Sequence, residues 1–157
     1  MDLNLAWHRS LPLTDDSKNN GVYAADLNAI PETPGIYVFL RVHGKTAECL
    51  YVGKAIKLRT RVKAELNNSK LMQGIKKSAT GKRHLFFAEF KARQGQQENR
   101  SLLTIERTLI RYYLARGDQL LNVQGTRLVK HSVTSVRPTF KKFLPQVIFF
   151  ENSAAGP

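Results

Sequence analysis

The sequence predicts an α/β domain of the α+β kind, and three observations support that prediction. Two short apolar runs, 36–40 and 49–52, are separated by a turn at Gly44, as the strands of a β-hairpin would be. A third apolar run, 84–91, carries phenylalanines on both faces, which is typical of a central strand. The longest helical pattern of the chain follows over 98–116.

The remaining elements of the core are predicted from helix breakers and from helical spacing. Residues 26–30 can form one helical turn, which ends at Pro31 because proline cannot continue a helix. Residues 55–66 have leucine or valine at i, i+4 and i+8, the spacing of a helix with one buried face. Ser69 is a candidate N-cap for a second short helix over 70–77.

The two ends of the chain are less regular. Residues 1–20 mix polar and apolar groups without a clear period. Residues 127–150 alternate basic and β-branched groups, which predicts one or two strands and a packed segment. At 157 residues the chain is long enough to form one domain with a substantial core.

The charge distribution indicates the class of partner. The chain has 25 Lys and Arg against 12 Asp and Glu, a net charge of +13. Residues 54–93 hold 12 of these basic residues and two acids. A basic block inside a folded domain favours a polyanion, most simply nucleic acid, over a surface that is merely well solvated. An interaction protein that binds an acidic partner is a further alternative.

The composition also excludes several classes. The one cysteine, Cys49, lies in an apolar strand and is interpreted as core filler, so no disulfide forms within the chain. No Cys/His zinc pattern is present. No stretch approaches the roughly 20 apolar residues of a membrane span, and the first 16 residues lack the basic region and long apolar run of a signal peptide. We therefore expect a soluble, cytoplasmic protein with no membrane partner.

Six polar residues are the candidates for chemistry. They are Tyr37, Tyr51, Lys54, Arg61, Glu106 and Asn122. Glu106 lies within the apolar stripe of the long helix, where a carboxylate is costly unless something compensates its charge. Its spacing leaves two readings equally open, an acid paired with a core arginine or at the stripe's edge, and a metal ligand at the floor of a cleft. Phosphodiester cleavage needs an activated water and positive charge on the phosphate, which this set of groups can supply.

The same residues carry a resemblance to the GIY-YIG nuclease family. Gly35-Ile36-Tyr37 stands as the first tripeptide and Tyr51-Val52-Gly53 as the second. Lys54 follows directly, and Arg61 falls in the next helix at the family's arginine position. Glu106 matches the metal-binding glutamate, and Asn122 resembles the closing asparagine. Several elements in the right order make the combination specific.

The resemblance implies an α/β fold with a small, mostly antiparallel three-stranded sheet flanked by helices. It implies a single GIY-YIG-like nuclease domain over 1–157, with its core at about 30–123. Residues 1–29 would be an N-terminal extension and 124–157 a C-terminal one. It further implies a DNA endonuclease that uses Mg²⁺ or Mn²⁺, one ion per active site. The family includes repair incision subunits, homing endonucleases, transposon-encoded nucleases and some restriction enzymes.

Roles follow from the resemblance. Tyr37 would be the general base for the attacking water, with Tyr51 as the competing candidate, and Lys54 would lower the pKa of the tyrosine. Arg61 would bind the scissile phosphate. The metal would sit on Glu106, and Asn122 would brace the site.

Alternatives remain for several of these residues. Both tyrosines can simply pack in the sheet. Arg59 is the rival of Arg61 on the same helix, and His84 and His131 are alternative bases. Glu65 departs from the family, because several relatives have a further tyrosine there. A helper role for it is not expected, although it can pair with Arg61 at i, i+4.

Eight further basic residues are expected to contact nucleic acid. They are Lys57, Arg59, Lys63, Lys70, Lys76, Lys77, Lys82 and Arg83. The partner expected is DNA, most simply double-stranded, and a homodimer remains open. The rival function is a non-catalytic DNA- or RNA-binding module that retained the nuclease fold.

Overall fold

The structure is a computed structural model that describes residues 2–122, 128–134 and 147–153. The chain forms two compact units, Met1–Asn122 and Val123–Pro157, and each is described by itself. In the second unit, β8 (Leu128–Thr134) and β9 (Val147–Ser153) form an antiparallel pair. The prediction of one or two strands in this region is therefore confirmed as two. The assignment of the whole chain to one nuclease domain stays a prediction.

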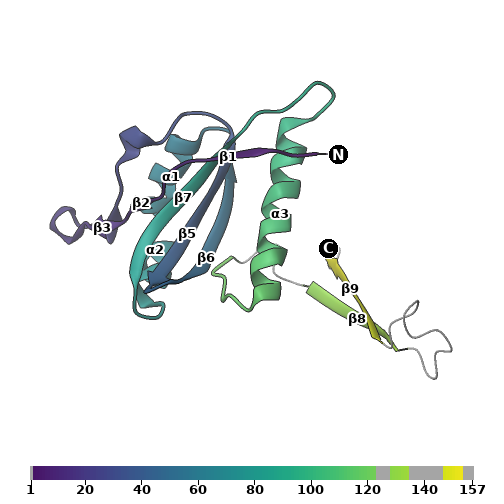
Figure 1. The fold of residues 1–157 in the computed structure, drawn as a ribbon. Coiled ribbons are helices and arrows are strands. Elements are labelled where there is room, and N and C mark those ends of the chain that lie inside the picture. Colours follow the sequence, from purple (N-terminus) through teal and green to yellow (C-terminus); the bar gives the residue numbers. More distant parts are fainter. Residues whose placement is uncertain (1, 123–127, 135–146, 154–157) are drawn as a thin grey trace. The chain divides into compact units, whose positions relative to one another are not determined.

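An antiparallel sheet forms the centre of the first unit. Its strands are β1 (Leu5–Trp7), β2 (Leu11–Pro12), β5 (Gly35–His43), β6 (Thr46–Ala55) and β7 (Lys82–Phe90). Their order is β1-β7-β5-β6, and β2 also pairs with β7 (Figure 1). The sheet has five strands, so the expectation of three is wrong. The two extra strands come from the amino-terminal 12 residues, and strands of three and two residues are too short to show a period.

Three α-helices accompany the sheet. They are α1 (Leu58–Leu66), α2 (Ser69–Lys77) and α3 (Glu98–Arg116). The first begins three residues later than predicted, because β6 continues to Ala55, which pairs with Gly35. The N-cap of α2 is Asn68 rather than Ser69, and its side chain accepts a hydrogen bond from the Leu71 amide. No helix in the described part of the chain is long and apolar enough to span a membrane.

Short elements complete the unit. They are β3 (Thr14–Asp15), η1 (Ser17–Asn19), β4 (Tyr23–Ala24) and η2 (Leu27–Ala29). The last of these 3₁₀ turns confirms the helical turn predicted over 26–30. Its N-cap is Asp26, whose carboxylate accepts a hydrogen bond from the Asn28 amide.

The sheet separates two hydrophobic cores. Helices α1 and α2 lie on one face of the sheet and α3 lies on the other (Figure 1). Because side chains alternate along a strand, Tyr37 and Phe39 of β5 pack in the core that contains α1 and α2. Ile36 and Val38 pack in the core that contains α3. The two tripeptides therefore lie between two helical layers.

The segment after α3 covers the free edge of β6. Asp118 accepts a hydrogen bond from the Cys49 amide at 2.9 Å, and the Leu121 amide donates to the Leu50 carbonyl at 2.7 Å. An edge strand with unpaired backbone groups is a site for unwanted pairing, and these contacts satisfy part of the edge. They also bring the residues that follow α3 to the strand that holds the second tripeptide.

Candidate active site

The glycines of the two tripeptides are needed for close packing. Tyr37 lies opposite Gly53 in the β5–β6 ladder and is fully buried. A Cβ atom on Gly53 would overlap Cζ and the hydroxyl oxygen of Tyr37. A Cβ on Gly35 would overlap the carbonyl oxygen of Ala88 on the neighbouring strand. The absence of side chains at these two positions is thus what allows the Tyr37 ring and the adjacent strand to lie where they do.

We expect Gly53→Ala to destabilise the fold by about 1–3 kcal/mol, the usual cost of overpacking a well-packed core. The added methyl group can be accommodated only if the buried Tyr37 ring moves. The free energy of unfolding from urea titration measures the effect. Gly44→Asn is the control: it lies in a turn with nothing within 4 Å of a Cβ, and asparagine tolerates its φ of +59°. Equal stability of the two variants would contradict this account.

Tyr37, Glu65 and Arg61 form a closed hydrogen-bonded triangle. The Tyr37 hydroxyl donates to Glu65 Oε1 at 2.8 Å. Arg61 Nη2 lies 2.9 Å from the same oxygen, and Arg61 Nε donates to the Tyr37 hydroxyl at 3.3 Å. The i, i+4 pair considered for Glu65 is therefore present.

Sequence reasoning missed how far Glu65 takes part in this site. The residue is 4% exposed, so its carboxylate lies inside the protein. The available signal was its position three residues after Val62, on the buried stripe of α1. The second signal was the buried Tyr37 hydroxyl, because a buried hydroxyl needs a hydrogen-bonding partner.

Both tyrosines are harder to ionise than a tyrosine in water. Burial raises the pKa of Tyr37, the nearby Glu65 charge raises it further, and the hydrogen bond from Arg61 opposes this. Burial is also the main reason why the pKa of Tyr51 is raised. The ring centroids of the two tyrosines lie 6.2 Å apart. The protein's own cations therefore do not bring either phenol below its ordinary pKa. Tyr51 is half-buried, whereas Tyr37 is fully buried.

Glu106 lies on α3, on the other side of the sheet from α1. It is partly buried, and burial raises the pKa of its carboxyl group. The charges of Lys54, Arg107 and Arg61 oppose that rise, so Glu106 lies within electrostatic reach of both Lys54 and Arg61. It forms none of the ion pairs found among the described residues. Glu106 is thus not paired with any core arginine that the structure describes, and its partial burial agrees with both remaining interpretations, an acid at the edge of the stripe and a metal ligand.

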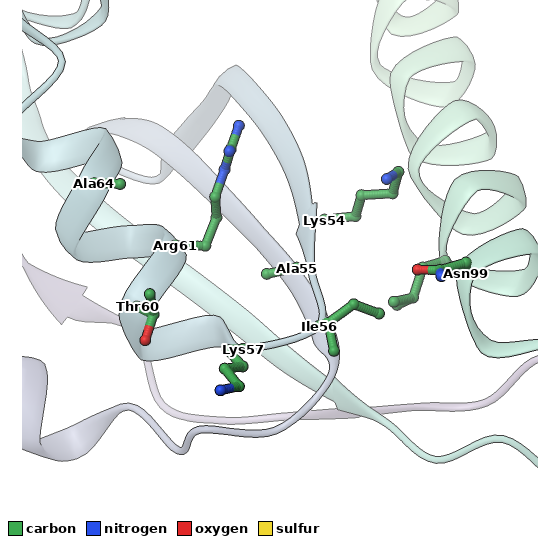
Figure 2. Close-up of a pocket in the computed structure, with 9 residues that line it drawn as sticks. Lys54, Ala55, Ile56, Lys57, Thr60, Arg61, Ala64 and Asn99 are labelled. Atoms are coloured by element: carbon green, nitrogen blue, oxygen red, sulfur yellow. The ribbon is translucent and has the colours of Figure 1, made fainter.

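A cleft of about 450 Å³ lies where β6 ends, and α1 and α3 both contribute to its lining. Its lining residues include Lys54, Lys57, Thr60, Arg61 and Asn99. Figure 2 shows Lys54 directed toward α3, and Arg61 rising from α1 on the other side of the strand. Cationic groups from β6 and α1 therefore face a common space that also reaches α3.

The donors at this site fit one hard divalent cation. No group of three or more His, Cys, Asp or Glu that could hold a metal occurs in the described ranges. Glu106 offers one partly buried carboxylate with the raised pKa expected of an acid that lacks a strong partner. Mg²⁺ is bound in many proteins through one or two carboxylates, with waters and substrate phosphate completing its octahedron. A zinc site, which needs three or four protein ligands, would not fit.

Asn122 braces β6. Its side-chain oxygen accepts from the Val52 amide at 3.0 Å, and its side-chain nitrogen donates to the Val52 carbonyl at 2.7 Å. The amide thereby takes the place of a neighbouring strand beside the second tripeptide. Both polar atoms of its side chain are used in this way, so Asn122 acts on the strand.

The alternative candidates for the phosphate-binding arginine and for the general base are Arg59, His84 and His131. Arg59 donates from Nε to the Ile30 carbonyl at 2.8 Å, which ties it to the segment before β5. His84 pairs with Leu40 in the β5–β7 ladder, on the face of the sheet opposite Tyr37. Its Nδ1 is buried and has no partner among the described residues. The side chain of His131 lies outside what the structure describes.

Most of the expected DNA-contacting residues lie on the surface, and Arg83 does not. The exposed ones are Lys57, Lys63, Lys70, Lys76, Lys77 and Lys82. Arg83 is 8% exposed, and its guanidinium donates to four backbone carbonyls that connect α2 to β7. The prediction that Arg83 contacts nucleic acid is therefore corrected: all its hydrogen-bonding nitrogens are used inside the protein.

The comparisons with known proteins find one partial similarity. A stretch of 58 residues is 45% identical to UvrABC system protein C of Thermus thermophilus. The stretch covers 37% of this chain and 9% of that protein. No protein-family model matches the chain, and no solved structure matches it. The similarity therefore concerns a small part of the relative, and the relative's overall activity is not transferred by it.

Proposed function

We propose that the chain is a metal-dependent DNA endonuclease of the GIY-YIG type. The observation that supports this most is the convergence of different elements on one cleft. Arg61 comes from α1 and Lys54 from β6, and the Glu106 carboxylate on α3 is within electrostatic reach of both. A module that only binds nucleic acid has no need of a partly buried carboxylate beside its cations, because the acid repels the phosphate backbone.

Each residue has a role in the proposed reaction. Arg61 binds the scissile phosphate and stabilises the charge that develops on it. Tyr51 is the better placed of the two phenols to meet the attacking water, because Tyr37 is fully buried. Its pKa is raised, so it would serve as general base only after losing its own proton to solvent, which the charge of a bound divalent cation would favour. Lys54 adds positive charge near Glu106, in the cleft that Arg61 also lines. Glu106 would hold Mg²⁺ or Mn²⁺, which supplies Lewis acidity at the phosphate when bound.

DNA is the proposed substrate. The excess of basic residues over 54–93 gives the polyanion-binding surface that a nuclease requires. The partial relative is named as a component of the UvrABC system, and the family that the tripeptides resemble includes repair incision subunits. A role in DNA repair is the proposal that agrees with both observations.

Nicking of supercoiled plasmid tests the proposal against the rival binding module. We expect relaxed circles to appear with Mg²⁺ or Mn²⁺ and to vanish when the metal is removed with EDTA. Binding of a labelled duplex should persist without the metal, because it depends on the lysines. Binding without any nicking, across both metals and both duplex and branched substrates, would support the module instead.

The lysines of α2 should set the electrostatic part of DNA binding. Lys76 and Lys77 are exposed in the last turn of that helix. Replacing both with alanine should weaken binding to all sequences and flatten the plot of log K against log salt by about one unit per lysine. Fluorescence anisotropy over a salt series measures the slope. An unchanged slope in the double variant would mean that α2 faces away from DNA.

A further inference from the structure

Glu65 is a buried acid that the proposed mechanism does not use. It is 4% exposed and lies on α1, one helical turn after Arg61. A buried carboxylate with a charged partner often contributes little to stability, because desolvation offsets the attraction. Its presence in the core beside the cleft therefore calls for a role other than holding the fold together.

Both oxygens of the Glu65 carboxylate are engaged. Oε1 accepts from the Tyr37 hydroxyl at 2.8 Å and lies 2.9 Å from Arg61 Nη2. Oε2 accepts from the Asn68 side chain at 3.4 Å, at the cap of α2. Contacts from β5, α1 and the start of α2 thus hold the carboxylate in one orientation.

The guanidinium of Arg61 is held along one edge only. Nε donates to the Tyr37 hydroxyl at 3.3 Å and Nη2 pairs with Glu65. The Arg61 side chain is nevertheless 53% exposed, and it lines the cleft (Figure 2). The Nε and Nη2 edge of the guanidinium is therefore held by Tyr37 and Glu65. Its other N–H groups remain available to a ligand in the cleft.

We propose that Glu65 is a positioning residue that, together with Tyr37, fixes the guanidinium of Arg61 toward the scissile phosphate. The inference rests on the proposed endonuclease function and deepens it. An arginine that is not held samples several rotamers and must lose that freedom during the reaction, which lowers the rate. A misplacement of about 1 Å can cost on the order of 100-fold. The Tyr37 hydroxyl, buried and resistant to ionisation, is the neutral link between acid and guanidinium in this arrangement.

Two substitutions of Glu65 separate positioning from structure. Glu65→Gln keeps an oxygen that accepts from both Tyr37 and Arg61, so we expect kcat for nicking to fall by about 10-fold or less. Glu65→Met keeps the volume and removes the acceptor, so kcat should fall on the order of 100-fold. The affinity for a duplex without metal should not change, because the exposed lysines provide it. Methionine leaves the buried Tyr37 hydroxyl without its acceptor, so the unfolding midpoint of this variant should fall. The rates are therefore compared at a temperature well below the midpoints of both variants.

A double-variant cycle tests whether Glu65 acts through Arg61. If it does, Glu65→Met has no further effect on kcat once Arg61 is glutamine. A double variant whose decrease in kcat equals the product of the two single decreases would overturn the proposal. A Glu65→Met protein that nicks DNA at the unchanged rate would also overturn it. Glu48→Gln is the matched control, since that acid pairs with Arg41 away from the cleft.

A measurement on Arg61 itself distinguishes this inference from the nuclease proposal. The Nε–H resonance of Arg61, assigned by its loss in Arg61→Lys, should be rigid and protected in the unchanged protein and in Glu65→Gln. It should become mobile in Glu65→Met. A resonance already mobile in the unchanged protein overturns the positioning role whether or not DNA is cut. Absence of nicking with a rigid resonance counts against the endonuclease function and leaves Glu65 as the residue that orders the arginine.

Discussion

Glu106→Gln should reduce nicking by about 10³-fold, the largest effect expected of any single substitution in this protein. The amide keeps the size of the side chain and removes the charge that would hold the divalent cation. Loss of the cation forfeits several kcal/mol of charge stabilisation in the transition state. Burial already disfavours the ionised form of Glu106, so only its cationic neighbours remain to support the charge. The initial rate of plasmid relaxation with Mg²⁺ measures the loss.

Glu98→Gln is the matched control for this experiment. Glu98 lies in the first turn of the same helix, so its substitution makes the same chemical change on α3. We expect nicking within twofold of the unchanged rate there. Duplex affinity without metal should be retained or slightly increased in Glu106→Gln, because a negative charge close to Lys54 and Arg61 has been removed. Full nicking activity in this variant would show that the carboxylate does not serve the reaction.

Arg61→Gln should reduce nicking by about 10²–10³-fold, the loss usual when one donor to a developing oxyanion is removed. The exposed part of this guanidinium faces the cleft, while its other edge is held by Tyr37 and Glu65. Arg59→Gln is the comparison on the same helix. Its side chain is tied to the Ile30 carbonyl, so we expect less than a 10-fold loss there. Rates at saturating DNA separate the two variants, and the reverse order would make Arg59 the phosphate ligand.

The elements of the core could be predicted from local pattern. The hairpin of β5 and β6, the third strand β7 and the helix α3 follow from apolar runs, glycine turns and helical spacing, which depend on near neighbours in the chain. The strands β1 and β2 could not be predicted. Each has two or three residues, and only pairing with β7, more than 70 residues away, makes them strands.

The residue types of the candidate site could also be predicted, but not all of their contacts. Two tyrosines, an arginine and an acid in a stripe of leucines indicate chemistry from the sequence alone. The burial of Arg83 was not foreseeable, because its partners are backbone carbonyls that carry no signature in the sequence. Ser69 was predicted as the cap of α2, and the cap is Asn68, one residue earlier.

Sequence alone establishes the class of groups, their order and their charge: paired tripeptides, a basic block and one acid among apolar residues. Which groups meet is a matter of tertiary packing. Tyr37 and Glu65 are 28 positions apart and share a hydrogen bond, because β5 and α1 bury the same core. A buried hydroxyl must have a hydrogen-bonding partner, but the packing of the whole fold determines which acceptor lies next to it. For this reason Glu65, for which the sequence indicated only an i, i+4 pair with Arg61, also accepts a hydrogen bond from Tyr37.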